Sequence, residues 1–149
     1  MSDFPARPAS EVEWEDLLVR VEITPRALRA AVDDAPAGHP AVLRALGGAV
    51  ARERRLEGLL EGLREGKPVR LAATEGAETG TEAELLDEFS RLRARNFARV
   101  QRRGIDVWDW KSDTEEGTLT AYRALLMTTR ADGALLAATR AAGREGRRG

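Results

Sequence analysis

The feature that most restricts what this chain can fold into is a repeat of apolar side chains between residues 40 and 64. Its positions are separated alternately by four and three residues, which places them on one side of an α-helix, whereas a half-buried strand needs alternation at every second residue. All of them are apolar except Glu53. The repeat predicts a long helix with one carboxylate on its buried face. The positions are Val42, Leu46, Ala49, Glu53, Leu56, Leu60 and Leu63.

Two adjacent glycines, Gly47 and Gly48, fall within this helix. Each weakens a helix interior by about 1 kcal/mol relative to alanine. The pair therefore indicates either close packing by a neighbouring segment or a simple local weakness.

The first helix is predicted to start at a capping-box pattern, Ser10–Glu13, in which the serine and the glutamate satisfy each other's backbone N–H groups. Thr24-Pro25 interrupts its apolar spacing. Because proline removes a helix N–H and crowds the preceding turn, we expect a kink there, or a restart with Thr24 as the N-cap.

The third and fourth helices are predicted from the same kinds of signal. A second capping box, Thr81–Glu84, starts the third helix and Gly104 ends it, while Ser112-Asp113-Thr114 and Thr118 are competing caps for the fourth. The expected inner positions are Leu85, Phe89, Leu92, Asn96 and Val100 in the third helix, and Leu119, Tyr122, Leu126, Thr129, Gly133 and Leu136 in the fourth.

The segment from residue 65 to residue 80 is rich in Gly, Thr and Glu and carries one short extended candidate, Val69-Arg70-Leu71. Antiparallel neighbouring helices are usually joined by about two to eight residues. The longer connection predicts that the second and third helices run parallel or lie diagonally. The predicted fold is all-α, a four-helix bundle with a long crossover, forming one domain over residues 1–149 with flexible ends at about 1–9 and 143–149.

Composition excludes several classes of function. The chain has no Cys, which rules out disulfides, thiolate metal sites and Cys nucleophiles. Its 24 basic and 25 acidic residues give a net charge of −1, and therefore no broad field for nucleic acid. Residues 1–5 have neither the basic start nor the apolar run typical of a signal peptide, and the sequence has no apolar run of the roughly 18 residues that a membrane span needs. We expect a cytoplasmic protein that binds neither nucleic acid nor a membrane.

Several segments together resemble the DinB/YfiT-like superfamily of bacterial four-helix bundles. They are Thr24-Pro25-Arg26-Ala27-Leu28, Val42-Leu43-Arg44-Ala45-Leu46 leading into Ala51-Arg52-Glu53-Arg54, Glu84-Leu85-Leu86-Asp87-Glu88-Phe89 after the long crossover, and Trp108 with Gly117-Thr118-Leu119 before a final helix that holds Asp132 and Leu136. The resemblance covers most of the chain. It implies the bundle fold and, in many members, a divalent metal held by three His. Some members are transferases or isomerases that use bacillithiol or mycothiol.

The residues at the corresponding metal positions depart from that pattern. The ligand of the second helix would fall near Gly48 or Ala49, and the pair of the fourth helix near Ala131 and Leu135. None of these side chains can bind a metal, and the chain has a single His, at position 39. We therefore predict a protein that carries neither metal nor cofactor.

The strongest candidate site is a polar cluster on the inner faces of the helices. Glu53 and Asp132 are the candidate catalytic groups, since two carboxylates can perform acid–base chemistry or hold a hard cation. Asn96, Thr128 and Thr129 are candidate pocket residues beside them. The alternative is that Glu53 pairs with an arginine, such as Arg93 or Arg130, and fixes the register of the helices.

Three other features have a functional and a structural interpretation. His39 is either a ligand or general base, or a residue that caps the second helix. Trp108 and Trp110 either line the mouth of a ligand pocket or plug one end of the bundle. The arginines 91, 93, 95, 99, 102 and 103 are either a phosphate-binding stripe or, as we favour, a solvated face paired with acidic residues.

These observations predict a non-catalytic binding or interaction protein with space for a small-molecule ligand in the bundle core. The alternative is a thiol-dependent transferase or isomerase that uses Glu53, Asp132 and His39. A homodimer is also predicted, because some apolar residues would form an exposed patch. Trp14, Leu17 and Leu18 lie together on the first helix, and Leu43 and Val50 lie off the predicted core face of the second.

Overall fold

The computed structural model describes residues 3–72 and 76–148, and four long helices account for most of them. The helices are α1 (Glu11–Asp33), α2 (Pro40–Glu65), α3 (Glu82–Arg103) and α4 (Ala121–Arg148). A 3₁₀ helix, η1 (Gly104–Asp109), and two short strands, β1 (Lys111–Thr114) and β2 (Gly117–Thr120), lie between α3 and α4.

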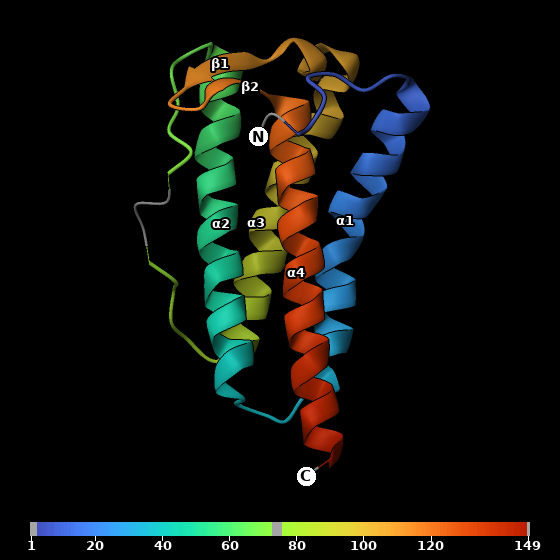
Figure 1. Ribbon diagram of the computed structural model, residues 1–149, viewed down its shortest axis with the longest axis vertical. Helices are drawn as coiled ribbons and strands as arrows, with labels where there is room; N and C mark the ends of the chain where they lie inside the picture. Colours follow the sequence, from blue (N-terminus) through green and yellow to red (C-terminus); the bar gives the residue numbers. More distant parts are fainter. Residues whose placement is uncertain (1–2, 73–75, 149) are drawn as a thin grey trace.

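The helices lie side by side along the long axis of the molecule (Figure 1). Helix α2 packs against α3 and α4, and α1 packs against α4 and α3. The connection between α2 and α3 returns along the outside of α2, so that α2 and α3 run in the same direction (Figure 1). A parallel course was one of the two arrangements expected from the length of this connection.

The apolar repeat of α2 is confirmed as its buried face, since all seven predicted positions, Glu53 included, are buried. The inner positions predicted for α3 are also all buried. Apolar contacts divide the core into two clusters, one around Trp14, Leu60 and Leu125 and the other around Leu28, Leu46 and Leu135. Glu53 lies on α2 between the parts of that helix that enter the two clusters.

Close packing explains one of the two adjacent glycines in α2. The backbone N–H of Glu78, in the crossover, donates to the carbonyl oxygen of Gly47 at 3.1 Å. A Cβ atom on Gly47 would lie 2.0 Å from the carbonyl oxygen of Glu78, whereas one on Gly48 would meet only the Arg52 side chain of the same helix, at 3.5 Å. The crossover can therefore follow α2 this closely only where α2 has no side chain.

Alanine substitutions at two glycines of α2 should have opposite effects. Gly47→Ala should destabilise the protein by about 1–3 kcal/mol, because the added methyl group overpacks the contact with Glu78. Gly58→Ala, with nothing within 4 Å of the added methyl group, should stabilise by up to about 1 kcal/mol through helix propensity. Urea unfolding followed by circular dichroism measures both. Equal effects of the two substitutions would contradict the close approach of the crossover.

Helix α1 has the predicted start but only half of the predicted capping box. Ser10 accepts from the backbone N–H of Glu13 at 3.2 Å, but the Glu13 carboxylate accepts instead from the Tyr122 hydroxyl, at 2.6 Å. The helix continues through Pro25, so Thr24 is not the N-cap of a second helix. The Thr24 hydroxyl instead lies 3.0 Å from the carbonyl oxygen of Arg20, in the same helix, and 2.9 Å from Asp132 Oδ2, in α4.

The single tyrosine of the chain gives a direct measure of pH-dependent stability. Burial, reinforced by the hydrogen bond to the Glu13 carboxylate, raises the pKa of Tyr122 to about 12. In the unfolded chain the tyrosine ionises near pH 10. The contribution of the protonated Tyr122 to the free energy of unfolding is therefore complete below about pH 10 and is lost as the pH rises through about 12. Ultraviolet titration of the phenolate band should show the raised pKa, and Glu13→Gln should lower it. A Tyr122 pKa near 10 in the folded wild-type protein would contradict this contact.

The segment before α4 differs from the prediction. Ser112, Asp113, Thr114 and Thr118 do not cap a helix but form an antiparallel hairpin, with Ser112 opposite Leu119 and Asp113 opposite Thr118. The cap of α4 is Thr120, whose Oγ1 accepts from the backbone N–H of Arg123 at 3.2 Å. Alternation over only four residues per strand, rich in β-branched threonine, was too short a signal to separate from capping.

The expected extended segment at residues 69–71 lies beside this hairpin. The backbone N–H of Val69 donates to the Asp113 carbonyl oxygen at 3.0 Å. The Glu115 carboxylate at the hairpin turn accepts from the backbone N–H groups of Leu71 and Ala72, both at 2.7 Å. The hairpin thus anchors the beginning of the crossover at one end of the helices (Figure 1).

The inner face predicted for α4 is only partly correct. Leu119 and Tyr122 are buried as expected, but Leu126, Thr129 and Leu136 are only partly buried and Gly133 is exposed, whereas the buried face contains Leu125, Asp132, Leu135 and Thr139. Residues 143–148 of the expected flexible end belong to the helix, and Gly149 lies outside the described residues. Gly143 packs on the backbone of Asp34 and Gly146 on Pro36, so the connection between α1 and α2 supports this last part of α4.

The patch expected to form a dimer interface is largely used within the chain. Trp14, Leu17 and Val50 are buried in the core, and Leu18 and Leu43 are partly buried. Their burial removes the reason for predicting the homodimer, which itself stays untested. Among the described residues, no helix combines the length and the apolar character needed to cross a membrane.

Candidate functional site

A polar cluster crosses the core at the level of Glu53. Glu53 of α2, Arg93 of α3 and Asp132 of α4 are 2%, 1% and 6% exposed. Ionised side chains are rarely buried this deeply unless they are paired and hydrogen-bonded, because the loss of hydration is very costly. Thr24 of α1 and Asn96 of α3 complete the set, which we call the polar cluster.

Arg93 is the centre of the polar cluster. Glu53 Oε1 accepts from Nε at 2.9 Å and from Nη2 at 2.6 Å. Asp132 accepts from the other edge of the guanidinium, with Oδ1 2.8 Å from Nη2 and Oδ2 2.9 Å from Nη1. The carbonyl oxygen of Val21 accepts from Nη1 at 2.9 Å. These contacts use the full donor capacity of an arginine, five N–H groups in one plane.

Pro25 explains why Val21 offers its carbonyl group. In an α-helix this oxygen would accept from the N–H of residue 25, four positions along. Proline has no N–H, so the acceptor of Val21 is left without its helical partner. Arg93 fills that role, and the Thr24 hydroxyl beside it reaches Asp132. The Thr24-Pro25 pair thus links α1 to the polar cluster without ending the helix.

Asn96 holds the remaining oxygen of Glu53. Its Nδ2 lies 3.0 Å from Glu53 Oε2 and 3.1 Å from the Glu53 carbonyl oxygen. The polar cluster therefore contacts all four helices. The structure brings together Glu53, Asn96 and Asp132 as the sequence predicted, and it provides Glu53 with one of the two arginines considered as its partner.

The electrostatics of the polar cluster favour a permanently charged arginine. Burial alone lowers the pKa of Arg93, but the hydrogen bonds to Asp132 and Glu53 raise it above the ordinary value. The expectation that Arg93 belongs to a solvated arginine face is wrong. Its neighbours Arg91, Arg95 and Arg99 do lie outside and pair with Glu88 or Glu57, as expected.

The polar cluster forms part of the wall of a cavity between α2 and α4. The cavity has a volume of about 210 Å³, and Glu53 and Asp132 line it. Most of the other lining is apolar and includes Leu56, Leu59 and Met127, with Leu119 contributed by the hairpin and Leu71 by the crossover. A cavity of this kind, apolar with a few polar groups, is the usual form of a small-molecule site.

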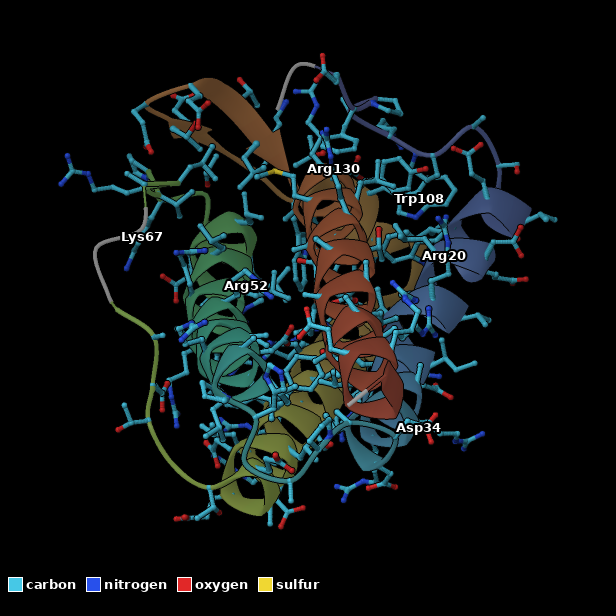
Figure 2. The ribbon with its side chains drawn as sticks, turned by 60° about the horizontal axis from the view of Figure 1, so that its bottom comes forward. Arg20, Asp34, Arg52, Lys67, Trp108 and Arg130 are labelled. Atoms are coloured by element: carbon cyan, nitrogen blue, oxygen red, sulfur yellow. The ribbon has the colours of Figure 1, made fainter. Side chains whose placement is uncertain are left out.

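Two arginines of α2, Arg52 and Arg55, also line this cavity, and the sequence analysis did not single them out as site residues. Both are partly buried, and Arg52 lies on the side of α2 that faces α4 (Figure 2). Burial lowers the pKa of Arg52; the Asp132 charge raises it, and the neighbouring Arg55 charge lowers it. A signal was present in the sequence: positions 52 and 55 each directly precede a position of the predicted buried face, 53 or 56, and they lie one helical turn apart.

The remaining predicted pocket residues are dispersed. Thr128 lines the α2–α4 cavity, and its hydroxyl donates to the Ala124 carbonyl oxygen. Thr129 lies on another side of α4, in a surface depression that includes Phe4 and Ile23. It is therefore not beside Glu53, as the incorrect inner stripe of α4 implied.

His39 lies apart from the polar cluster. Its Nδ1 accepts from the backbone N–H of Ala41 at 3.1 Å, which caps the start of α2. Its Nε2 lies 3.5 Å from a Glu145 carboxylate oxygen. The structure places His39 in the capping role that was one of its two predicted interpretations, and it does not line the cavity that contains Glu53 and Asp132.

The two tryptophans pack against the apolar cluster at the hairpin end of the helices. Trp108 meets Trp14 edge to face, with ring centroids 6.3 Å apart. Trp110 lines a second hollow between α2 and α3 that includes Arg64 and Arg99. Neither tryptophan lines the α2–α4 cavity, so the mouth of that cavity is formed by other residues.

The positions at which the resemblance would place a metal do not suit one. Ala49 and Ala131 line the α2–α4 cavity, Leu135 is buried in the core, and Gly48 has no side chain. None offers a donor atom. Within residues 3–72 and 76–148, no three His, Cys, Asp or Glu residues are grouped so that they could hold a metal ion.

Comparison of the chain with models of protein families, with curated proteins and with solved structures finds no match. Its function must therefore be inferred from the polar cluster and the cavity beside it.

Proposed function

We propose that this chain is a DinB-like four-helix bundle that acts as a non-catalytic small-molecule-binding protein, with its ligand in the α2–α4 cavity. The observation that carries the proposal is the cavity itself. Most of its walls are apolar, it is partly open to solvent, and its volume of about 210 Å³ suits a ligand smaller than a typical drug. The parallel α2–α3 arrangement and the resemblance noted in the sequence support the bundle assignment.

The state of the carboxylates favours binding over catalysis. A general base needs a lone pair within reach of the substrate and a protonation state that can change. Glu53 and Asp132 both direct oxygens to Arg93, and Asn96 occupies the other oxygen of Glu53. The thiol-dependent transferase that we considered as an alternative would also need His39, which caps the opposite end of α2 from the hairpin.

The proposal can be tested with seven-carbon probes that differ only in their head group: heptanoate, heptan-1-ol and heptylamine. Calorimetry should detect binding of at least one probe to the wild-type protein. Ala131→Phe should abolish it by filling the cavity, since Ala131 is part of the lining. Ala134→Phe is the matched control, because Ala134 is exposed on the same helix and outside the cavity lining.

Circular dichroism must show that each variant remains folded, and Met127→Trp provides a second way to fill the cavity if Ala131→Phe does not fold. Binding that is lost in either cavity-filling variant and retained in the control supports the proposal. If no probe binds at millimolar concentration, or if binding survives both fillings, the α2–α4 cavity is not a ligand site.

A further inference from the structure

We infer that the ligand of the α2–α4 cavity is a monoanionic carboxylate with an apolar body, and that Arg52 and Arg55 bind its carboxylate group. This inference rests on the proposed function and adds the chemical class of the ligand. Four observations lead to it: the pairing of the arginines, the local balance of charge, the character of the cavity walls and the state of the polar cluster.

Arg52 and Arg55 differ from the arginines around them in having no ion-pair partner among the residues that the structure describes. Arg54, between them in sequence, is exposed and pairs with Glu78 and Glu88. Arg64, Arg95 and Arg99 also pair with glutamates. The two arginines that line the cavity therefore have donors available to a ligand.

The local balance of charge leaves one positive charge in excess. The charged groups that line the cavity are Arg52, Arg55, Glu53 and Asp132, and Arg93 lies behind the two carboxylates. Three guanidinium groups therefore face two carboxylates. A single negative charge on the ligand neutralises the set, whereas a second negative charge would be repelled by Glu53 and Asp132.

The arrangement of polar and apolar walls fixes the orientation of the ligand. A guanidinium group binds a planar carboxylate through two parallel N–H···O bonds. These bonds are stronger for a half-buried arginine than for an exposed one, because less water competes for the donors. Leu56, Leu59 and Met127 then surround the rest of the ligand. Glu53 and Asp132 already accept from Arg93, so they offer little to a cationic head group. Their charges also repel a carboxylate placed directly beside them, which directs the head group of the ligand to Arg52 and Arg55.

The experiment compares head groups by calorimetry, using heptanoate, heptan-1-ol, heptylamine and heptyl phosphate with the wild-type protein. Heptanoate should bind about tenfold more tightly than the alcohol, as expected for hydrogen bonds to a charged group, and more tightly than the phosphate. Its affinity should fall as salt is raised, while that of the alcohol should not.

Substitutions then locate the head group. Arg52→Gln and Arg55→Gln should each weaken heptanoate binding by about tenfold and leave heptan-1-ol unchanged. Arg54→Gln is the control on the same helix, because Arg54 points outward to its own glutamates, and it should leave both affinities within about twofold of the wild type.

Each outcome bears on one of the two proposals. If heptanoate and heptan-1-ol bind equally, or if the amine or the phosphate binds most tightly, the carboxylate inference is overturned while ligand binding in the cavity stands. If heptanoate is preferred but neither Arg52→Gln nor Arg55→Gln weakens it, the assignment of the head group is wrong. If no probe binds, the proposed function fails and this inference fails with it.

Discussion

Arg93→Met should destabilise the protein by about 3–5 kcal/mol. Removal of one partner from a buried ion pair leaves the other charge without compensation, and here it would leave two carboxylates facing each other. Glu53 and Asp132 are 2% and 6% exposed, so water cannot readily replace the lost contacts. The Val21 carbonyl oxygen would also lose its hydrogen-bond donor, because Pro25 has no N–H to replace Arg93.

Urea unfolding followed by circular dichroism measures the loss, and Arg91→Met provides the control on the same helix. Arg91 is exposed and its ion pair is with Glu88 on the surface, so its replacement should leave the unfolding midpoint nearly unchanged. If Arg93→Met costs less than about 1 kcal/mol, the ion pairs of the polar cluster do not form as the structure shows.

A combined variant separates the cost of orphaned charges from the value of the cluster. In the background Glu53→Met, Asp132→Leu, the further change Arg93→Met should cost far less than it does alone, because no buried carboxylate remains. A loss of equal size in both backgrounds would mean that Arg93 stabilises the protein through the packing of its stem and not through its charge.

Trp14→Ala should by itself lower the free energy of unfolding by about 3–5 kcal/mol, because it opens a cavity in the core. Trp14 is 4% exposed and its ring contacts Trp108 and Tyr122, in both cases with centroids 6.3 Å apart. Val12→Ala is the control on the same helix. Val12 is 66% exposed, so its truncation should leave the stability nearly unchanged.

The dependence of the Trp14→Ala effect on protein concentration tests where Trp14 packs. A loss of packing within one chain should be independent of concentration, whereas a loss at an interface between copies should grow as the protein is diluted. A loss of stability that depends on protein concentration would support the dimer interface predicted from the sequence, and it would contradict the burial of Trp14 within one chain. Light scattering on the wild-type protein measures the oligomeric state itself.

The sequence determined the features that depend on local periodicity and on caps. The four-and-three spacing of α2 predicted its buried face correctly, Glu53 included. The capping box at Thr81 and the end at Gly104 predicted the bounds of α3 to within a residue. These features follow from neighbouring residues, since a helix places every third or fourth side chain on one face whatever surrounds it.

Part of the candidate site was also predictable. A carboxylate on an apolar seam needs a partner, which led to Glu53, Asn96, Asp132 and an arginine before any contact was known. The sequence did not show which of its many arginines is buried. Position 93 lies nearer to the predicted inner face of α3 than positions 91 and 95 do, but at the edge of that face a long arginine side chain can either enter the core or reach solvent. Only the packing of α3 between α1 and α2 places the first inside and the others outside.

The tertiary structure alone decided the features that depend on contacts between distant segments. The buried face of α4 was misassigned by one position, because its alanines and threonines suit either face and the choice depends on which helices it meets. Gly47 is needed because the crossover bonds to α2 there, and the last turns of α4 are helical because Gly143 and Gly146 meet the connection between α1 and α2. The unpaired arginines of the cavity belong to the same class, because contacts between segments far apart in the chain leave no periodic signal in either segment. The hairpin is local and was missed for another reason: each of its strands has only four residues, too few for a clear alternation.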